Sequence, residues 1–325
     1  MRGMSLKSVF LDYATVSSGD GDLDTTALRR VLPDIQLHDV TTDTEIDARL
    51  KGVQVLLINK AKITRARIEA NPQLRLICLT ATGTDNVDLV AAKEHGVAVC
   101  NVRDYCTRSL MQHVLAVILA HTHKLRGYTD LATGGAWERI PQFTMLNYPI
   151  RELSGRVLGI VGYGNLGRAV AQAAQIALDM KIMIANRPGS PATPGRVDLD
   201  TLLKQADVLS LHCPLNDATR NMISARELGL MKPDALLVNT ARGGLVDSAA
   251  LAAALRAGQI GGAAIDVLPQ EPPKDGNPLL DPTLPNLIIT PHVAWAAREA
   301  RQRCLDEVAA NVADFLRGGE RNRVV

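Results

Sequence analysis

Short apolar segments alternate with helix-like segments along the first hundred residues of the chain. The apolar segments have the length of strands, and they include 8–13, 53–60, 75–84 and 97–102. The segments between them carry apolar residues at helical spacing. Strands that alternate with helices predict a parallel sheet covered by helices on both faces.

A second alternation of the same kind begins after a long helical pattern at 109–127. Its strand-like segments are 156–164, 181–187, 206–214, 235–244, 261–269 and 286–293. In open sheets of this kind, ligands bind beyond the carboxyl ends of the strands, so functional residues are expected in the turns that follow the strands. The pattern therefore predicts an α/β protein with two Rossmann-like, doubly wound parallel-sheet domains.

Composition adds little to this picture. A length of 325 residues favours two domains. The net charge is +2 and the basic residues are scattered, so neither a nucleic acid nor a membrane is expected as a partner. The longest apolar run, 114–120, is far shorter than the ~20 residues that span a bilayer. The N-terminus lacks the apolar core of a signal peptide, so we expect a cytoplasmic protein. The five cysteines include no C-x-x-C pair, so we expect reduced thiols and no metal site.

The segment GYGNLG at 162–167 follows a strand-like run and begins a helix-like one. In this context Gly162 permits a tight turn, Gly164 lets the backbone approach a pyrophosphate, and Gly167 allows the helix to pack closely on the strand. The start of the helix offers N–H donors to the anion. The motif therefore predicts a dinucleotide-binding site.

About 20 residues beyond such a motif, a domain that binds NAD usually carries an acidic residue for the ribose 2′-hydroxyl. This chain has Asn186 and Arg187 there. An arginine can pair with the 2′-phosphate of NADP, which a carboxylate would repel. We therefore expect a preference for NADPH over NADH, with Ser190 as a further phosphate contact. Alternatively, Asn186 binds the ribose of NAD and Arg187 is a solvated surface residue.

An arginine, two carboxylates and a histidine follow three successive strand-like segments: Arg242, then Asp266 and Glu271, then His292. Such an arginine can bind the carboxylate of a 2-oxo acid through two hydrogen bonds and polarise its carbonyl, while a protonated histidine gives a proton to the oxygen. A glutamate beside the histidine stabilises the protonated imidazole. The order of these residues predicts the reduction of a 2-oxo acid.

These motifs, together with TATGTDNVDL at 80–89 and HCPLNDATRNMI at 212–223, resemble the D-isomer-specific 2-hydroxyacid dehydrogenase family. Within it, INK at 58–60 and PHVAWAAREARQR at 291–303 are most similar to glycerate dehydrogenases, also called hydroxypyruvate reductases. The resemblance implies that His292 is the acid–base catalyst, Glu271 its partner and Arg242 the residue that orients the substrate. It implies a cofactor domain, 103–293, inserted into a flavodoxin-like substrate domain formed by 1–102 and 294–325.

The resemblance also implies ligand contacts, among them Asp266 at the nicotinamide carboxamide. The full set of cofactor contacts that we expect comprises Gly162, Gly164, Asn165, Leu166, Gly167, Asn186, Arg187, His212, Cys213, Pro214, Thr219, Thr240, Ala241 and Asp266. The backbone of Thr82 and Gly83, with Lys60 nearby, is expected to face the substrate. A homodimer is expected, formed in part by the apolar helix of 109–125.

The resemblance leaves the substrate open. The first hypothesis is the reduction of hydroxypyruvate or glyoxylate to D-glycerate or glycolate, and the second is a dehydrogenase for another small acid such as D-lactate. A phosphoglycerate enzyme is disfavoured because the chain stops soon after its last helix, and a formate dehydrogenase because Glu271 is present. A protein that only senses the dinucleotide is a further alternative, which very slow turnover would reveal.

Overall fold

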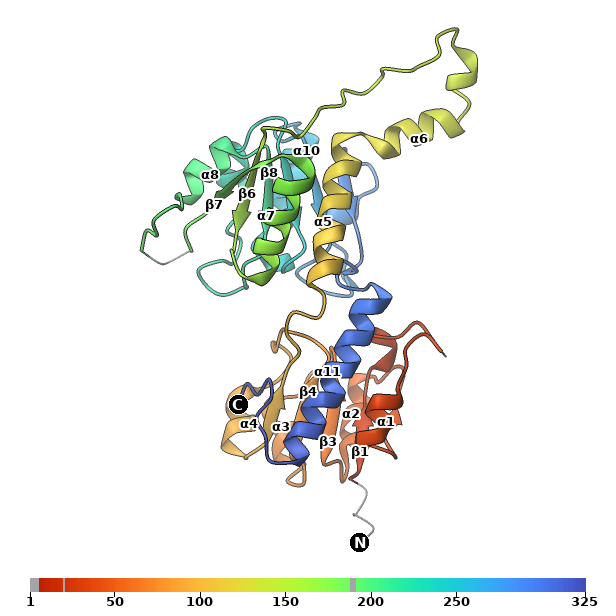
Figure 1. Cartoon of the computed structure of the whole chain (residues 1–325), viewed down its shortest axis with the longest axis vertical. Helices are drawn as coiled ribbons and strands as arrows, with labels where there is room; N and C mark the ends of the chain where they lie inside the picture. Colours follow the sequence, from red (N-terminus) through yellow and green to blue (C-terminus); the bar gives the residue numbers. More distant parts are fainter. Residues whose placement is uncertain (1–5, 20, 188–190) are drawn as a thin grey trace. The chain divides into compact units, whose positions relative to one another are not determined.

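The computed structural model describes residues 6–19, 21–187 and 191–325, and the chain forms two compact units (Figure 1). Unit 1 comprises Met1–Cys106 and Trp295–Val325, and unit 2 comprises Thr107–Ala294. Unit 2 is thus inserted between the two chain segments of unit 1. Each unit has its own parallel sheet and its own core, which confirms the predicted α/β class with two parallel sheets.

Unit 1 is built on a five-stranded parallel sheet with the strand order β2-β1-β3-β4-β5, which is the flavodoxin-like order. Its strands are β1 (Ser8–Phe10), β2 (Gln36–Leu37), β3 (Val55–Ile58), β4 (Leu76–Leu79) and β5 (Ala98–Cys100). Its helices are η1 (Tyr13–Thr15), α1 (Thr26–Val31), α2 (Asp43–Leu50), α3 (Arg65–Glu69), α4 (Leu89–Glu94) and α11 (Arg298–Leu316).

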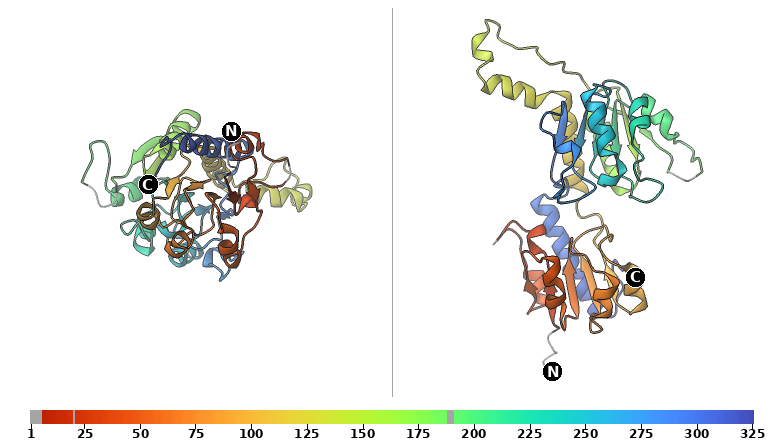
Figure 2. Two further views of the ribbon diagram at one scale, coloured as in Figure 1. Left: turned by 90° about the horizontal axis from the view of Figure 1, so that it is seen from below. Right: turned by 180° about the vertical axis from the view of Figure 1, so that it is seen from behind.

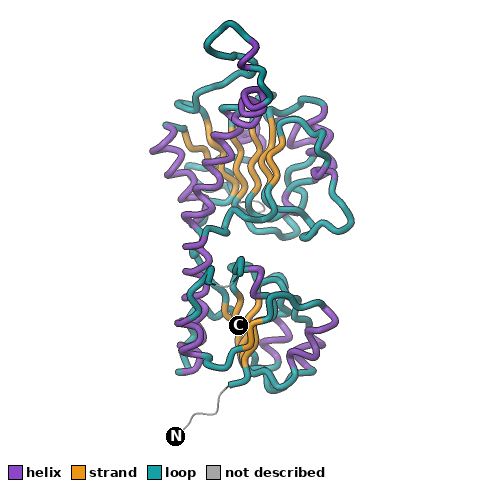
Figure 3. Tube along the Cα trace, turned by 90° about the vertical axis from the view of Figure 1, so that its right-hand side faces the viewer, coloured by secondary structure: helices purple, strands orange, loops and turns teal. Residues whose placement is uncertain are grey.

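Both faces of this sheet are buried. Successive residues of a strand point to opposite faces, so Leu76 and Cys78 of β4 pack with α1 and α11, whereas Ile77 and Leu79 pack with the helices of the other face. Figure 3 shows the strands side by side with helices around them. Burial on both faces explains why these strands are continuous apolar runs in the sequence.

Unit 2 is built on a six-stranded parallel sheet with the order β11-β10-β9-β8-β6-β7. Its strands are β6 (Val157–Val161), β7 (Lys181–Ile184), β8 (Val208–Leu211), β9 (Leu236–Asn239), β10 (Gly262–Ile265) and β11 (Leu287–Ile289). Its helices are α5 (Thr107–Thr122), α6 (Leu125–Thr133), η2 (Trp137–Arg139), α7 (Asn165–Leu178), α8 (Leu199–Gln205), α9 (Ala225–Leu230), η3 (Gly243–Leu245), α10 (Ser248–Arg256) and η4 (Pro278–Leu280). The strand order reverses between β6 and β8, and such a switch point is where open sheets bind ligands.

The helix-like pattern at 109–127 forms two helices rather than one. The chain leaves α5 after Thr122, Lys124 has a left-handed φ of +51°, and α6 begins at Leu125. The prediction of one helix to residue 125 is therefore wrong at its end, because neither glycine nor proline marks the break. Leu110, Val114 and Ile118 of α5 are buried in the core of unit 2. Among the described residues, no helix is both long enough and apolar enough to cross a bilayer.

Residues 125–150 extend away from the sheet of unit 2 and are called the arm below (Figures 1 and 2). The two legs of the arm meet where the Tyr128 hydroxyl donates to the carbonyl of Tyr148 at 2.7 Å and the two rings form an edge contact. Beyond this point the side chains of Phe143 and Leu146 are 88% and 85% exposed. The arm therefore presents large apolar side chains to solvent in a single chain.

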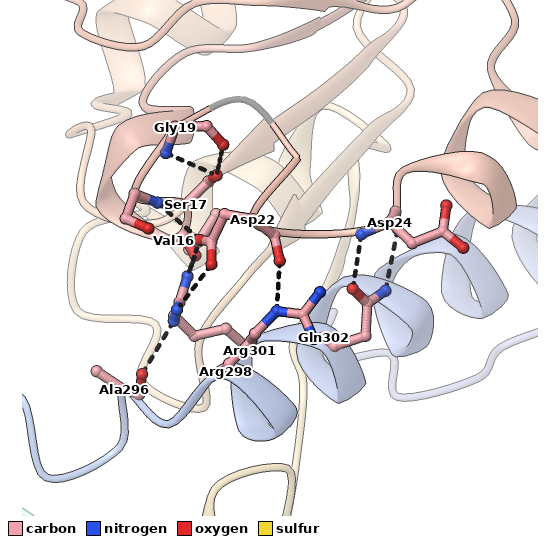
Figure 4. Close-up of polar contacts among 10 residues, drawn as sticks. Val16, Ser17, Gly19, Asp22, Asp24, Ala296, Arg298, Arg301 and Gln302 are labelled. Atoms are coloured by element: carbon pink, nitrogen blue, oxygen red, sulfur yellow. Dashed lines mark hydrogen bonds and ion pairs between the residues drawn. The ribbon is translucent and has the colours of Figure 1, made fainter.

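The start of α11 is tied to the loop that follows η1 in unit 1 (Figure 4). Arg301 forms a bidentate ion pair with Asp22 and also donates to the carbonyl of Ala296. The Gln302 amide exchanges two hydrogen bonds with the backbone of Asp24. The Arg301 guanidinium holds the pKa of Asp22 well below its usual range. These bonds fix the chain segment that enters unit 1 from unit 2.

Candidate active site

The turn after β6 has the geometry that a dinucleotide site requires. Gly162 has a φ of +94°, and a Cβ there would lie 2.5 Å from the amide nitrogen of Cys213. A Cβ on Gly167 would collide with the carbonyl oxygen of Gly162. Gly164, which caps α7, has no atom within 4 Å of its ideal Cβ position. Close backbone packing therefore explains why positions 162 and 167 are glycine. The open space at Gly164 fits a pyrophosphate beside the N–H groups of Asn165, Leu166 and Gly167.

The ends of β8 and β9 border the same switch point. His212 follows β8, and its Nε2 lies 2.9 Å from the hydroxyl of Ser210. Thr240 follows β9 and precedes Ala241. The Nδ1 atom of His212 and the hydroxyl of Thr240 are buried, and neither makes a hydrogen bond within the described residues. Burial lowers the pKa of His212 to about 4, so its imidazole is neutral near pH 7. Two buried polar atoms without protein partners suit a site that receives a polar ligand.

The remaining sequence-predicted cofactor residues lie in turns next to these strands. Thr219 closes the turn after Cys213, where its hydroxyl donates to the carbonyl of Pro214 at 2.8 Å. Asn186 follows β7, and its side-chain oxygen accepts a 2.9 Å hydrogen bond from the Thr193 backbone. The side chain of Arg187 is exposed. Ser190, expected as a further phosphate contact, lies outside the described residues.

His292 and Glu271 form the central pair of the candidate site. Nδ1 of His292 lies 2.6 Å from one carboxylate oxygen of Glu271, and the other oxygen accepts a 2.9 Å hydrogen bond from the backbone of Leu268. Both side chains are about one third exposed, at 27% and 32%. The pair is therefore anchored to the protein on the Nδ1 side, which orients the imidazole ring of His292.

Arg242 follows β9 and leads into a turn that touches the Glu271 loop. The carbonyl of Arg242 accepts a 2.9 Å hydrogen bond from the Asn239 side chain, and its guanidinium donates to the carbonyl of Ala241 at 2.8 Å. A Cβ on the next residue, Gly243, would collide with the backbone of Leu268. This close approach joins the turn of Arg242 to the loop of Glu271 within unit 2.

The backbone of His292 is held by Asp266, which is 2% exposed at the end of β10. The carbonyl of Asp266 accepts from the His292 N–H at 2.7 Å. Its carboxylate accepts from the N–H groups of Val293 and Ala294, both at 2.9 Å. His292 has a φ of +57°, a left-handed conformation that is uncommon for a residue other than glycine. The N–H groups of His292, Val293 and Ala294 all donate to Asp266, and these three hydrogen bonds keep His292 in this conformation.

Sequence reasoning missed two residues of this network. The Thr290 hydroxyl donates to the Asp266 carboxylate, and His113 of α5 lies 3.5 Å from the same hydroxyl through its Nε2. Thr290, two positions before His292, was visible in the sequence as a polar residue, but no pattern connects it to His113, 177 positions earlier.

The sequence-predicted substrate residues lie in unit 1, at the ends of the neighbouring strands β3 and β4. Lys60 follows β3, and its side chain is exposed. Thr82 and Gly83 follow β4, where the Thr82 hydroxyl donates to the carbonyl of Val102 at 2.7 Å. The structure thus brings these three residues to one edge of the unit 1 sheet, and Arg242, Glu271 and His292 to one edge of the unit 2 sheet.

Comparison with known proteins identifies relatives over most of the chain. Residues 115–294 match the family described as D-isomer specific 2-hydroxyacid dehydrogenase, NAD binding domain. The chain is 46% identical to glycerate dehydrogenase of Methylorubrum extorquens, over 87% of this chain and 89% of the relative. It is 35% identical to hydroxypyruvate reductase of Blautia hydrogenotrophica, over 98% and 99% of the two chains.

A solved structure is similar over nearly the whole chain. It is the NADPH-dependent glyoxylate/hydroxypyruvate reductase of Sinorhizobium meliloti in complex with NADP and malonate. The TM-score is 0.80 at 25% identity, and the match covers 98% of this chain and 96% of the other.

Proposed function

The chain belongs to the D-isomer specific 2-hydroxyacid dehydrogenases, and on this basis we propose that it reduces hydroxypyruvate and glyoxylate to D-glycerate and glycolate. As a member of this family it is an oxidoreductase that uses a nicotinamide dinucleotide. Relatives named glycerate dehydrogenase and hydroxypyruvate reductase support the choice of substrate. The observation that carries the proposal is the 2.6 Å contact between His292 and Glu271 at the end of β11.

In the proposed mechanism each residue contributes the chemistry of its own side chain. Reduced nicotinamide, when bound in unit 2, supplies the hydride. Arg242 binds the substrate carboxylate through two parallel hydrogen bonds and polarises the adjacent carbonyl. His292 gives the proton on Nε2 to the carbonyl oxygen, which becomes the hydroxyl of the product. Glu271 stabilises the imidazolium before the transfer. Lys60 and the Thr82–Gly83 backbone of unit 1 bind the rest of the substrate.

Steady-state kinetics test the proposed substrates. We expect kcat/KM for hydroxypyruvate and glyoxylate to exceed that for pyruvate. Faster turnover of pyruvate would instead favour a D-lactate dehydrogenase. Binding of the dinucleotide without measurable turnover of any 2-oxo acid would favour a protein that senses the dinucleotide.

The proposed cofactor preference is NADPH, and it depends on Arg187. Its exposed side chain follows β7 together with Asn186, where an acidic residue would select NAD. We expect kcat/KM to be at least about tenfold higher for NADPH than for NADH, a difference of about 1.4 kcal/mol. Arg187→Ala should remove most of this preference. Lys181→Ala, which removes a cation at the opposite end of β7, is the matched control and should leave the preference unchanged. A wild-type preference for NADH would refute the assignment.

The proposed assembly is a homodimer, and the proposed location is the cytoplasm. Exposed apolar side chains on the arm support association with a second copy, since large exposed apolar patches mark interaction surfaces. None of the five cysteines, all of which lie in described residues, forms a disulfide. Reduced thiols are the usual state of cysteine in the cytoplasm.

A further inference from the structure

Asp12 lies two residues beyond β1 and is only 7% exposed. Its carboxylate accepts three hydrogen bonds from consecutive backbone N–H groups. One oxygen accepts from Asn59 at 2.8 Å, and the other accepts from Lys60 at 2.6 Å and from Ala61 at 2.8 Å. These three residues form the turn that follows β3. Three N–H groups that converge on one carboxylate fix the backbone of the turn, and hydrogen bonds to a charged acceptor are the strong ones.

The same turn is held from its other side by Asn86. The Asn86 amide donates to the carbonyls of Asn59 at 3.3 Å and Ala61 at 2.9 Å. Asn59 is 4% exposed, and its side-chain amide donates to the hydroxyl of Thr15 at 3.0 Å. Of the three residues in the turn, only Lys60 has an exposed side chain. The turn is a rigid base from which one lysine side chain extends.

We propose that Asp12 is a positioning residue for substrate recognition, which fixes the backbone of Asn59–Ala61 so that the ammonium group of Lys60 meets an oxygen of a small 2-oxo acid. This inference rests on the proposed function, in which Lys60 binds the substrate. A lysine side chain has high rotamer entropy, and fixing its Cα removes the part of the cost that loop motion would add. Asp12 itself touches neither substrate nor cofactor in this proposal.

The test is a double-mutant cycle between Asp12 and Lys60 on the full chain. In Asp12→Asn the amide oxygen can still accept hydrogen bonds, but the NH2 group cannot. At least one of the three backbone N–H groups therefore loses its acceptor. We expect KM for hydroxypyruvate to rise about tenfold with kcat changed by less than about twofold, since binding rather than chemistry is affected. KM for NADPH should not change. In a Lys60→Met background, Asp12→Asn should raise KM no further, because both changes remove the same contact.

Two further variants separate positioning from folding. Asn86→Ala removes the hydrogen bonds to the carbonyls of Asn59 and Ala61, so it should give the same rise in KM for hydroxypyruvate. This variant replaces Asp12→Asn if that variant does not fold. Asp88→Asn is the matched control, because Asp88 also accepts a backbone hydrogen bond in unit 1, at the start of α4. It should leave KM unchanged. An equal rise in KM with Asp88→Asn, a fall in kcat alone, or additive effects of Asp12→Asn and Lys60→Met would overturn the inference.

The wild-type enzyme separates failure of this inference from failure of the proposed function. If another small 2-oxo acid is turned over instead of hydroxypyruvate, the proposed substrate is wrong, and the same cycle with that acid still decides the role of Asp12. If no 2-oxo acid is turned over, the inference falls with the function. Normal turnover of hydroxypyruvate with an unchanged KM in Asp12→Asn refutes the inference alone.

Discussion

His292 and Glu271 are joined by one short hydrogen bond whose strength depends on the charge of both residues. In Glu271→Gln the partner becomes a neutral amide, which stabilises the imidazolium less than a carboxylate does. Because reduction needs protonated His292, kcat for hydroxypyruvate should fall by at least about tenfold. The measurement is the steady-state kinetics of hydroxypyruvate reduction at constant pH.

The control for this change is Asp275→Asn. Asp275 accepts a hydrogen bond from Gln270 in the same loop, so Asp275→Asn should leave kcat unchanged. An unchanged kcat in Glu271→Gln would show that the carboxylate does not support the imidazolium.

The residue types of the candidate site were predictable from the sequence because each follows a strand and each has chemistry suited to 2-oxo acids. The bonds that orient them were not. Asp266 at the nicotinamide carboxamide stays a prediction, and the structure shows that its carboxylate accepts hydrogen bonds from the backbone after His292. The contact between His113 and Thr290 depends on how α5 packs on the sheet. Such tertiary hydrogen bonds have no local sequence pattern.

At the scale of elements, the glycine motif contains two kinds of glycine that the sequence does not distinguish. Gly162→Ala should destabilise the protein by about 1–3 kcal/mol, because the backbone has a positive φ and the new Cβ meets the backbone of His212 and Cys213. Gly164→Ala should leave the melting temperature nearly unchanged, since its φ is −82° and no atom lies within 4 Å. It should weaken NADPH binding, because the methyl group enters the space assigned to the pyrophosphate.

Thermal unfolding followed by circular dichroism and NADPH titration by fluorescence measure the two effects separately. The pair of variants acts as a mutual control. Unchanged NADPH affinity in Gly164→Ala would mean that the open space is not the pyrophosphate site.

Element types were easier to predict than element ends. Strands buried on both faces are continuous apolar runs, and the helices between them have clear helical spacing, so the order of elements followed from the sequence. The break between α5 and α6 did not, because Lys124 adopts a left-handed conformation without the glycine that usually permits it.

At the scale of the whole molecule, the sequence predicted two α/β domains, since two alternations are separated by a long helix. How the arm would extend was not predictable. Its residues had no strand-like or helix-like periodicity beyond α6, and the exposure of Phe143 and Leu146 is known only from the structure.

This exposure leads to a prediction about assembly. If the arm packs against a second copy, the wild-type protein should sediment with twice the 34.9 kDa mass of one chain. Phe143→Asp combined with Leu146→Asp places two charges in that apolar contact, and burying unpaired charges is costly. The double variant should sediment as a monomer at micromolar concentration. Val90→Asp on α4 of unit 1 is the control, because Val90 is also exposed, at 63%, but lies outside the arm. A dimer that persists in the double variant would place the interface elsewhere, and a monomeric wild type would refute the proposed homodimer.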